Sequence, residues 1–174
     1  MQIRKAEKRD ISAVAAIFSA IHTAEEQGRL TIGWVREIYP TEETAQAALD
    51  RDDLFVMEEE GRIVASAIIN RVQVPDYAKG QWLYAARDDE VMVLHTLCIH
   101  PEAMGRGCGK AFIAFYEAYA RENGCPYLRM DTNAINAAAR AMYRKLGYRE
   151  AGIVPCVFNG IEGVGLVLLE KYMG

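Results

Sequence analysis

The chain has 174 residues, of which 51% are hydrophobic and 25% charged, and its formal net charge at pH 7 is −4. This length and composition are typical of one soluble domain over residues 1–174, which can bury a core without disulfides or a structural metal. The acidic net charge gives no electrostatic reason to expect nucleic acid or an anionic membrane as a partner. The sequence has no apolar run long enough to span a bilayer and no apolar signal core after Met1, so we expect a cytoplasmic protein.

The first half of the chain predicts a short strand, two helices and a strand hairpin. Apolar residues recur at helical spacing after Asp10, which can cap a helix, and Thr41 can cap a second one. The stretches 30–39 and 74–89 have weak periodicity. In chain order the expected elements are a strand at Gln2–Ala6, a helix from Asp10 that ends before Gly28, a helix from Thr41 to about Leu49, and strands at Leu54–Glu58 and Arg62–Arg71.

The second half alternates strands with amphipathic helices and ends in two more strands. The turn-forming pair Asn159-Gly160 favours a hairpin between those last two. The expected elements are a strand at Val91–Ile99, a helix at Gly107–Asn123, a strand at Tyr127–Asp131, a helix at Asn133–Leu146, and strands at about Arg149–Val157 and Val164–Lys171. This order predicts an α/β fold in which helices cover a mixed sheet.

A glycine-rich segment, Gly105-Arg106-Gly107-Cys108-Gly109-Lys110, lies between the strongly apolar strand and an amphipathic helix. Three glycines allow the backbone to approach a ligand closely, and the first amides of the helix have no partner within it. Together with the helix dipole and the charges of Arg106 and Lys110, they suit a phosphate. The alternative is a flexible helix-entry turn with solvated basic residues.

Two familiar nucleotide motifs do not fit this segment. A P-loop needs glycine where Met104 stands and serine or threonine where Ala111 stands. A dinucleotide-binding loop needs GxGxxG directly after its strand, whereas residues 100–104 intervene here, although Asp131 lies at a suitable distance for the acidic residue. A nucleotide-binding domain therefore remains only a less favoured alternative.

Two spaced motifs resemble the GCN5-related N-acetyltransferase (GNAT) superfamily. The first is a strand ending near proline, followed by Gln/Arg-x-x-Gly-x-Gly/Ala at the start of a helix, and Met104 replaces the usual Gln or Arg here. The second, Asn-x-x-Ala-x-x-x-Tyr-x-x-x-Gly-Phe/Tyr, is matched by Asn136, Ala139, Tyr143, Gly147 and Tyr148. The resemblance runs from about Gln2 to Lys171. It implies a mixed, mostly antiparallel sheet flanked by helices, and transfer of an acetyl group from acetyl-CoA to a primary amine by direct attack through a tetrahedral intermediate.

The resemblance also implies where coenzyme A binds. The backbone of Leu97, Cys98 and Ile99 is expected to pair with the pantetheine arm, and Asn136 to bond near the thiol end. The pyrophosphate is expected on Gly105, Arg106, Gly107, Cys108, Gly109 and Lys110. Met104 removes one side-chain contact from this cradle while leaving its backbone amides in place. A non-catalytic acyl-CoA-binding module with the same cradle is the alternative from another class of protein.

Amine acetylation needs a proton acceptor and a donor to the departing thiolate. Asn136 and Tyr143 are seven residues apart, so they share a helix face, and Tyr143 is expected to be the general acid. Strand alternation places His95 on one face with Leu97 and Ile99, making it a candidate base, although a core histidine is equally consistent and a bulge would invert the facing. Glu90 or a water chain is the alternative base.

Cysteine chemistry and metals receive little support from the residue spacing. The four cysteines are widely separated and predict free thiols and no metal site. Cys98 and Cys108 lie in the expected coenzyme site, yet neither has an evident base, so we interpret both as small apolar residues.

The acceptor pocket is expected where aromatic residues gather in the two irregular stretches. These residues are Trp34, Tyr39, Tyr77, Trp82 and Tyr84, and the alternative is that they only anchor loops. They favour an amine with apolar or aromatic surface, either a small molecule or a peptide. A homodimer is also left open.

Overall fold

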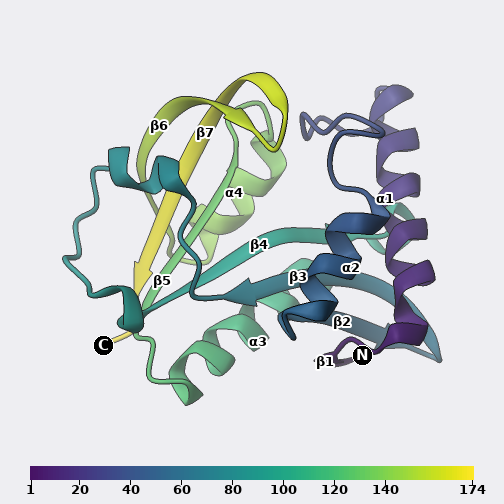
Figure 1. Cartoon of the computed structure of the whole chain (residues 1–174), viewed down its shortest axis with the longest axis horizontal. Coiled ribbons are helices and arrows are strands. Elements are labelled where there is room, and N and C mark those ends of the chain that lie inside the picture. The colour runs from purple at the N-terminus through teal and green to yellow at the C-terminus, as the bar shows by residue number, and fades with distance from the viewer.

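The computed structural model describes all 174 residues and contains one seven-stranded sheet in the order β1-β2-β3-β4-β5-β7-β6 (Figure 1). The strands are β1 (Gln2–Lys5), β2 (Leu54–Glu59), β3 (Arg62–Asn70), β4 (Val91–Ile99), β5 (Tyr127–Asn133), β6 (Arg149–Phe158) and β7 (Ile161–Tyr172). The helices are α1 (Ile11–Glu26), α2 (Glu42–Asp50), α3 (Cys108–Glu122) and α4 (Ala137–Lys145). Neighbouring strands are antiparallel except β4 and β5, which confirms the predicted mixed sheet.

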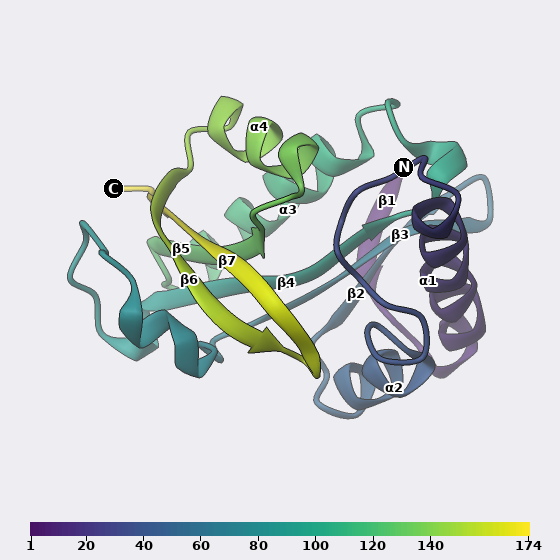
Figure 2. The same cartoon turned by 90° about the horizontal axis from the view of Figure 1, so that it is seen from above.

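Helices cover both faces of the sheet (Figure 2). Strand β2 shows why, because Val56 packs towards α1 and α2 while Met57 packs towards α3 and α4. Alternate residues of a strand point to opposite faces, so a strand covered on both sides needs a continuous apolar run. Phe112 and Tyr116 of α3 are fully buried against one face. No helix of the chain combines the length and apolar character needed to cross a bilayer.

The two parallel strands separate part-way along their length. Pairing of β4 with β5 begins at Val91 with Tyr127 and ends at Leu94 with Met130. Just beyond this point β4 contains a bulge, where Thr96 has a φ of 51° and two β4 residues stand opposite Ala67 of β3. Beyond the bulge, β4 has no strand partner on the β5 side.

The bulge inverts the side chains that follow it. Met92 and Leu94 pack on the α3 side, and so do Leu97 and Ile99, whereas Cys98 packs on the α1 side. The prediction that His95 shares a face with Leu97 and Ile99 is therefore wrong, because the extra residue shifts the alternation by one.

Candidate active site

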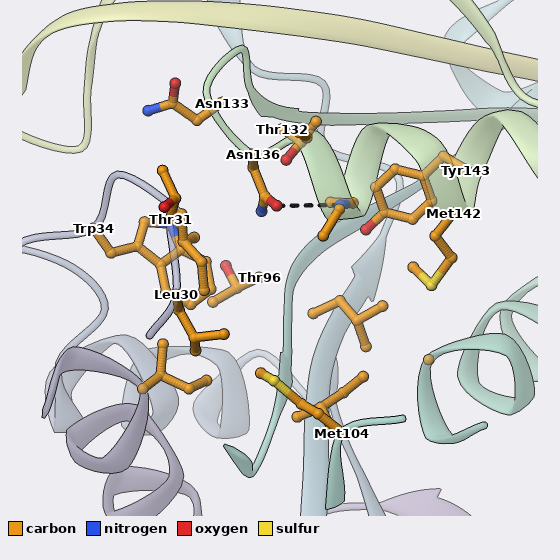
Figure 3. Close-up of a pocket in the computed structure, with 18 of the residues that line it drawn as sticks. Leu30, Thr31, Trp34, Thr96, Met104, Thr132, Asn133, Asn136, Met142 and Tyr143 are labelled. Carbon is orange, nitrogen blue, oxygen red and sulfur yellow. Dashed lines mark hydrogen bonds between the residues drawn. The ribbon is translucent and has the colours of Figure 1, made fainter. Parts of the chain in front are cut away.

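A cavity of about 760 Å³ lies where β4 and β5 separate. Its walls are the end of β4 with the loop into α3, the end of β5 with α4, and the segment from Arg29 to Tyr39. In Figure 3, Trp34, Leu30 and Thr31 stand opposite Tyr143 and Met142. The structure brings together at this wall eleven of the residues predicted from the sequence: Trp34, Tyr39, Leu97, Ile99, Gly105, Gly107, Cys108, Gly109, Lys110, Asn136 and Tyr143.

The glycine-rich loop presents free amides to this cavity. Gly105 and Gly107 have φ values of 76° and 85°, which favour glycine, and a Cβ on either would meet nothing within 4 Å. Gly107 precedes α3 without any side-chain cap, and no amide N–H from Gly105 to Lys110 donates a hydrogen bond within the chain. Such a nest at a helix N-terminus fits a diphosphate.

Gly109 has a different role from the other two glycines. A Cβ there would lie 3.0 Å from Sδ of Met142 and 3.1 Å from Cδ1 of Ile99, so this glycine lets α3 approach α4 and β4. The two cations of the loop also differ. Lys110 lines the cavity and forms no ion pair, whereas Arg106 lies outside the wall, 2.7 Å from the carboxylate of Glu59.

Asn136 and Tyr143 line the same cavity, Asn136 as the N-cap of α4 and Tyr143 from within the helix. Asn136 caps the helix by accepting the N–H of Ala139 at 3.1 Å, and for that reason α4 begins at Ala137 rather than at Asn133 (Figure 3). Tyr143 is 6% exposed, its hydroxyl has no hydrogen-bond partner in the chain, and the ring points its oxygen into the cavity. Burial raises the pKa of Tyr143, so the phenol stays protonated at neutral pH.

Asp131 is a wall residue to which sequence reasoning gave no catalytic role. It is the first β5 residue beyond the pairing with β4, and its Oδ2 accepts the hydroxyl of Tyr77 at 2.8 Å. Asp131 is half-buried, and partial loss of solvent around its carboxyl raises the pKa of Asp131 to about 6. Beside it, the hydroxyls of Tyr39 and Thr96 are hydrogen-bonded to each other. The sequence contained a signal for this residue, since an acidic residue lies near the end of the strand that precedes the second motif.

A second cavity, of about 590 Å³, adjoins the first. Four residues line both: Tyr39, Thr96, Asp131 and Phe158. His95 lines only the second cavity, where it donates from Nε2 to Oδ1 of Asn70 at 3.0 Å. Asn70 donates in turn to Asp53 at 2.8 Å, which fixes the amide orientation and so the histidine tautomer. Burial lowers the pKa of His95 to about 4, which keeps the ring neutral.

Several predicted site residues lie away from the first cavity. Glu90 is at the other end of β4, where its carboxylate accepts the amide of Arg87 at 3.1 Å. Cys98 is buried in the core on the α1 side. Trp82 stacks on Arg129 at 4.1 Å, and Tyr84 packs on Tyr127 and Tyr172, so both anchor loops.

The segment from Arg29 to Tyr39 is fixed to α1 by a carboxylate. Glu25 accepts the amides of three successive residues, Ile32, Gly33 and Trp34. On the far side, Gly33 lies so close to Asn133 that a Cβ would stand 2.2 Å from the amide nitrogen. The segment therefore reaches from α1 to the end of β5 and closes one side of the cavity.

Comparison with known proteins decides the family. The model of the Acetyltransferase (GNAT) family matches residues 15–148. The chain belongs to the GNAT family. It is thus an acyltransferase that uses acetyl-CoA, and the free amides of Gly105–Lys110 fit the diphosphate of that coenzyme.

The relatives of this GNAT chain are distant in sequence. The uncharacterized N-acetyltransferase YhfO of Bacillus subtilis is 23% identical over 152 residues, which are 86% of this chain and 91% of YhfO. A mycothiol acetyltransferase of Amycolatopsis mediterranei is 28% identical over 71% of this chain and 37% of its own length.

Solved structures share the fold. A GNAT acetyltransferase of Streptococcus agalactiae superposes with a TM-score of 0.81 at 22% identity, covering 99% of this chain and 95% of the other. The structure of yncA from Salmonella typhimurium, solved with its cofactor acetyl-CoA, gives 0.69 at 19% identity, covering 100% and 94%.

Proposed function

We propose that this chain, acting as a single domain, is an N-acetyltransferase that moves the acetyl group of acetyl-CoA directly to a primary amine of a small molecule or peptide. The observation that carries the proposal is that a nest of free amides and the unpartnered hydroxyl of Tyr143 open into the same cavity. One end of this cavity suits a diphosphate and the other suits a departing thiolate. A homodimer remains a prediction, which sedimentation equilibrium would check.

The residues that would hold the coenzyme come from three elements. Gly105–Lys110 would bind the diphosphate through backbone amides, and Asn136 would bond near the thiol end. Beyond Leu94, the edge of β4 that faces away from β3 has no strand partner, so its backbone groups are free to pair with the amides of the pantetheine arm. When bound, acetyl-CoA supplies a thioester whose carbonyl carbon the amine attacks.

Tyr143 would donate its proton to the departing sulfur. A phenol with pKa near 10 is a weaker acid than a thiol near 8.5, an uphill difference of about 2 kcal/mol in water. The raised pKa of Tyr143 adds to this cost, but it also keeps the hydroxyl protonated and ready to donate. A hydrogen bond to a charge that develops in an enclosed cavity can offset that difference.

The two bases predicted from the sequence, His95 and Glu90, are poorly suited to accept the proton of the amine. An alkylammonium with pKa near 10.4 needs about 4.6 kcal/mol to supply the free amine at pH 7. Glu90 lies outside both cavities, and a histidine whose pKa is about 4 is a weak proton acceptor. Neither Glu90 nor His95 is therefore well suited to accept the amine's proton.

The test pairs a coenzyme measurement with an activity measurement. Gly107→Ala should weaken CoA binding at least about tenfold by calorimetry, because its Cβ would enter the diphosphate site. Gly124→Ala is the matched control, since Gly124 also has a positive φ, 70°, and equal free space but lies at the other end of α3. Both variants should lose similar stability, about 1 kcal/mol.

Wild-type protein should release free CoA thiol when a panel of primary amines is added. Two results would overturn the proposal: equal CoA affinity in Gly107→Ala and Gly124→Ala, or no thiol release with any amine or peptide.

A further inference from the structure

Asp131 is the one carboxylate that borders both cavities. The first cavity contains the amide nest and Tyr143, and the second is lined by side chains that no coenzyme contact requires. A group at their junction can touch an acceptor that enters from the second cavity and meets the thioester in the first. We propose that Asp131 binds the acceptor as an ammonium ion and then removes its proton. This inference rests on the proposed function.

The hydrogen bonds of Asp131 leave one oxygen available. Oδ2 accepts the hydroxyl of Tyr77, which comes from the short helical turn at Pro75–Lys79 and fixes the carboxylate plane. No hydrogen bond of the chain reaches Oδ1. Asp131 lies just beyond the last β4–β5 pair, at the point where the two strands separate and the first cavity opens.

No cation of the chain neutralises this carboxylate. The titratable groups around it are phenols, a thiol, an imidazole and another acid: Tyr39, Tyr77, Tyr143, Cys156, His95 and Asp76. Arg51 lines the second cavity but is bound to Asp53 at 2.9 Å. A half-buried carboxylate without a neutralising cation is destabilising, and a cationic ligand reduces that cost.

The carboxylate of Asp131 is also a better proton acceptor than the imidazole of His95, which lines only the second cavity. Its pKa is raised to about 6, whereas that of His95 is lowered to about 4. The stronger base also has the free oxygen. Asp131 therefore combines the geometry and the proton affinity that a general base requires.

The step balances as follows. Asp131 takes one proton from the ammonium group, the nitrogen lone pair forms the C–N bond to the thioester carbonyl carbon, and the C–S bond breaks when the resulting tetrahedral intermediate collapses. Tyr143 gives its proton to the departing sulfur, and the second proton of the nitrogen passes through water to restore the phenol. Asp131 returns its proton to solvent through the second cavity. The net result is one amide, one free thiol and one proton.

The surroundings of Asp131 also define the acceptor class. Half of the residues that line the second cavity are hydrophobic, among them Ile38, Val72, Val74 and Phe158. A primary ammonium on an apolar body fits it. An acceptor with a carboxylate beside its amine would bring a negative charge next to Asp131, and the two carboxylates would repel each other.

The experiment compares wild type, Asp131→Asn and the control Asp88→Asn, which removes an exposed carboxylate outside both cavities. The probes are 2-phenylethylamine, phenylalanine and a tripeptide amide that begins with phenylalanine, so that small-molecule and peptide sources are both sampled. Binding of each amine without coenzyme is followed by calorimetry from about pH 5 to 8, and CoA affinity and thiol release are measured separately.

We expect wild type to bind 2-phenylethylamine about tenfold more tightly as the pH rises through the range in which Asp131 ionises, and Asp131→Asn to lose this dependence. The variant should keep its CoA affinity. Its kcat/KM should fall at least about 100-fold for 2-phenylethylamine and for the tripeptide amide, the two probes without a carboxylate. Wild type should prefer 2-phenylethylamine to phenylalanine, and the preference should shrink in the variant. Asp88→Asn should match wild type throughout.

The inference fails if Asp131→Asn turns over as fast as wild type, or if amine binding is equally independent of pH in both. In either case thiol release by wild type would leave the proposed function standing. If wild type released no thiol, the proposed function would fail, and the pH dependence of amine binding would still decide whether Asp131 is an ammonium site.

Discussion

The hydroxyl of Tyr143 has no hydrogen-bond partner in the chain, although the Tyr143 ring packs on the ring of Tyr148 with a centroid distance of 6.1 Å. A polar atom left free in such a place is best explained by a partner that arrives with the ligand. Tyr143→Phe should therefore lower kcat about 10- to 100-fold and leave CoA affinity unchanged. Tyr148→Phe is the control, because that hydroxyl bonds to Glu117 away from the cavity. Steady-state kinetics with calorimetry checks this, and a fully active Tyr143→Phe enzyme would contradict the role.

Asp131 should also lower the stability of the fold at neutral pH. Its pKa is raised by burial from 3.8 to about 6, so the folded state binds the proton more tightly than the unfolded chain does. The penalty is absent below about pH 4, appears as pH rises through 4 to 6, and is complete above 6. Because Asp131 is half-buried, Asp131→Asn should raise the free energy of unfolding by about 2–3 kcal/mol at pH 7.5 and by almost nothing at pH 3.5. Urea unfolding at both pH values measures this, and a variant equally or less stable at pH 7.5 would contradict it.

The same residues show what the sequence could and could not predict. The second motif was sufficient to place Asn136 and Tyr143 at the same cavity, although Asn136 proved to be the cap of α4 and not part of the helix. The facing of His95 was not predictable, because one extra residue at Thr96 reverses every side chain after it. The environment of Asp131 depends on Tyr77, 54 residues earlier in the chain, and no local pattern records that contact.

At the scale of elements, the segment from Arg29 to Tyr39 depends on Glu25. This carboxylate near the end of α1 is unfavourable for the helix dipole, yet it accepts three amides of the segment. Glu25→Gln should weaken these bonds, lowering stability by about 1–2 kcal/mol and speeding hydrogen exchange at Ile32, Gly33 and Trp34 about tenfold. Glu43→Gln, which changes an exposed side chain of α2, is the control. Unchanged exchange at these amides would show that other contacts hold the segment.

Element order was predictable where hydrophobic periodicity was strong, and element ends were not. The sequence pattern gives every strand and helix in the correct order, because each strand contributes apolar residues to the sheet and each helix packs an apolar face against it. The aromatic residues of the irregular stretches divided in a way that composition does not reveal. Trp34 and Tyr39 line the cavity, whereas Trp82 and Tyr84 pack on side chains of the sheet, and only tertiary contacts distinguish the two groups.

At the scale of the whole molecule, the first cavity joins segments that are far apart in sequence. Its walls come from residues 29–39, from 96–110 and from 131–143, and no long strand pairing links the first of these to the others. A ligand that contacts all three segments should therefore suppress the local unfolding of all three together. At 100 times its Kd, CoA should raise the free energy of unfolding by about 2.7 kcal/mol.

Hydrogen exchange can show whether this stabilisation is shared among the three segments. We expect CoA to slow hydrogen exchange in all three segments, including the amides of residues 30–35. Helix α2 lies outside the first cavity, so its amides that exchange by local opening should keep their rate. Protection confined to Gly105–Lys110 would mean that the coenzyme meets only the amide nest. The cavity would then not bring the thioester to Tyr143 and Asp131, and the catalytic roles argued for those residues would lose their structural basis.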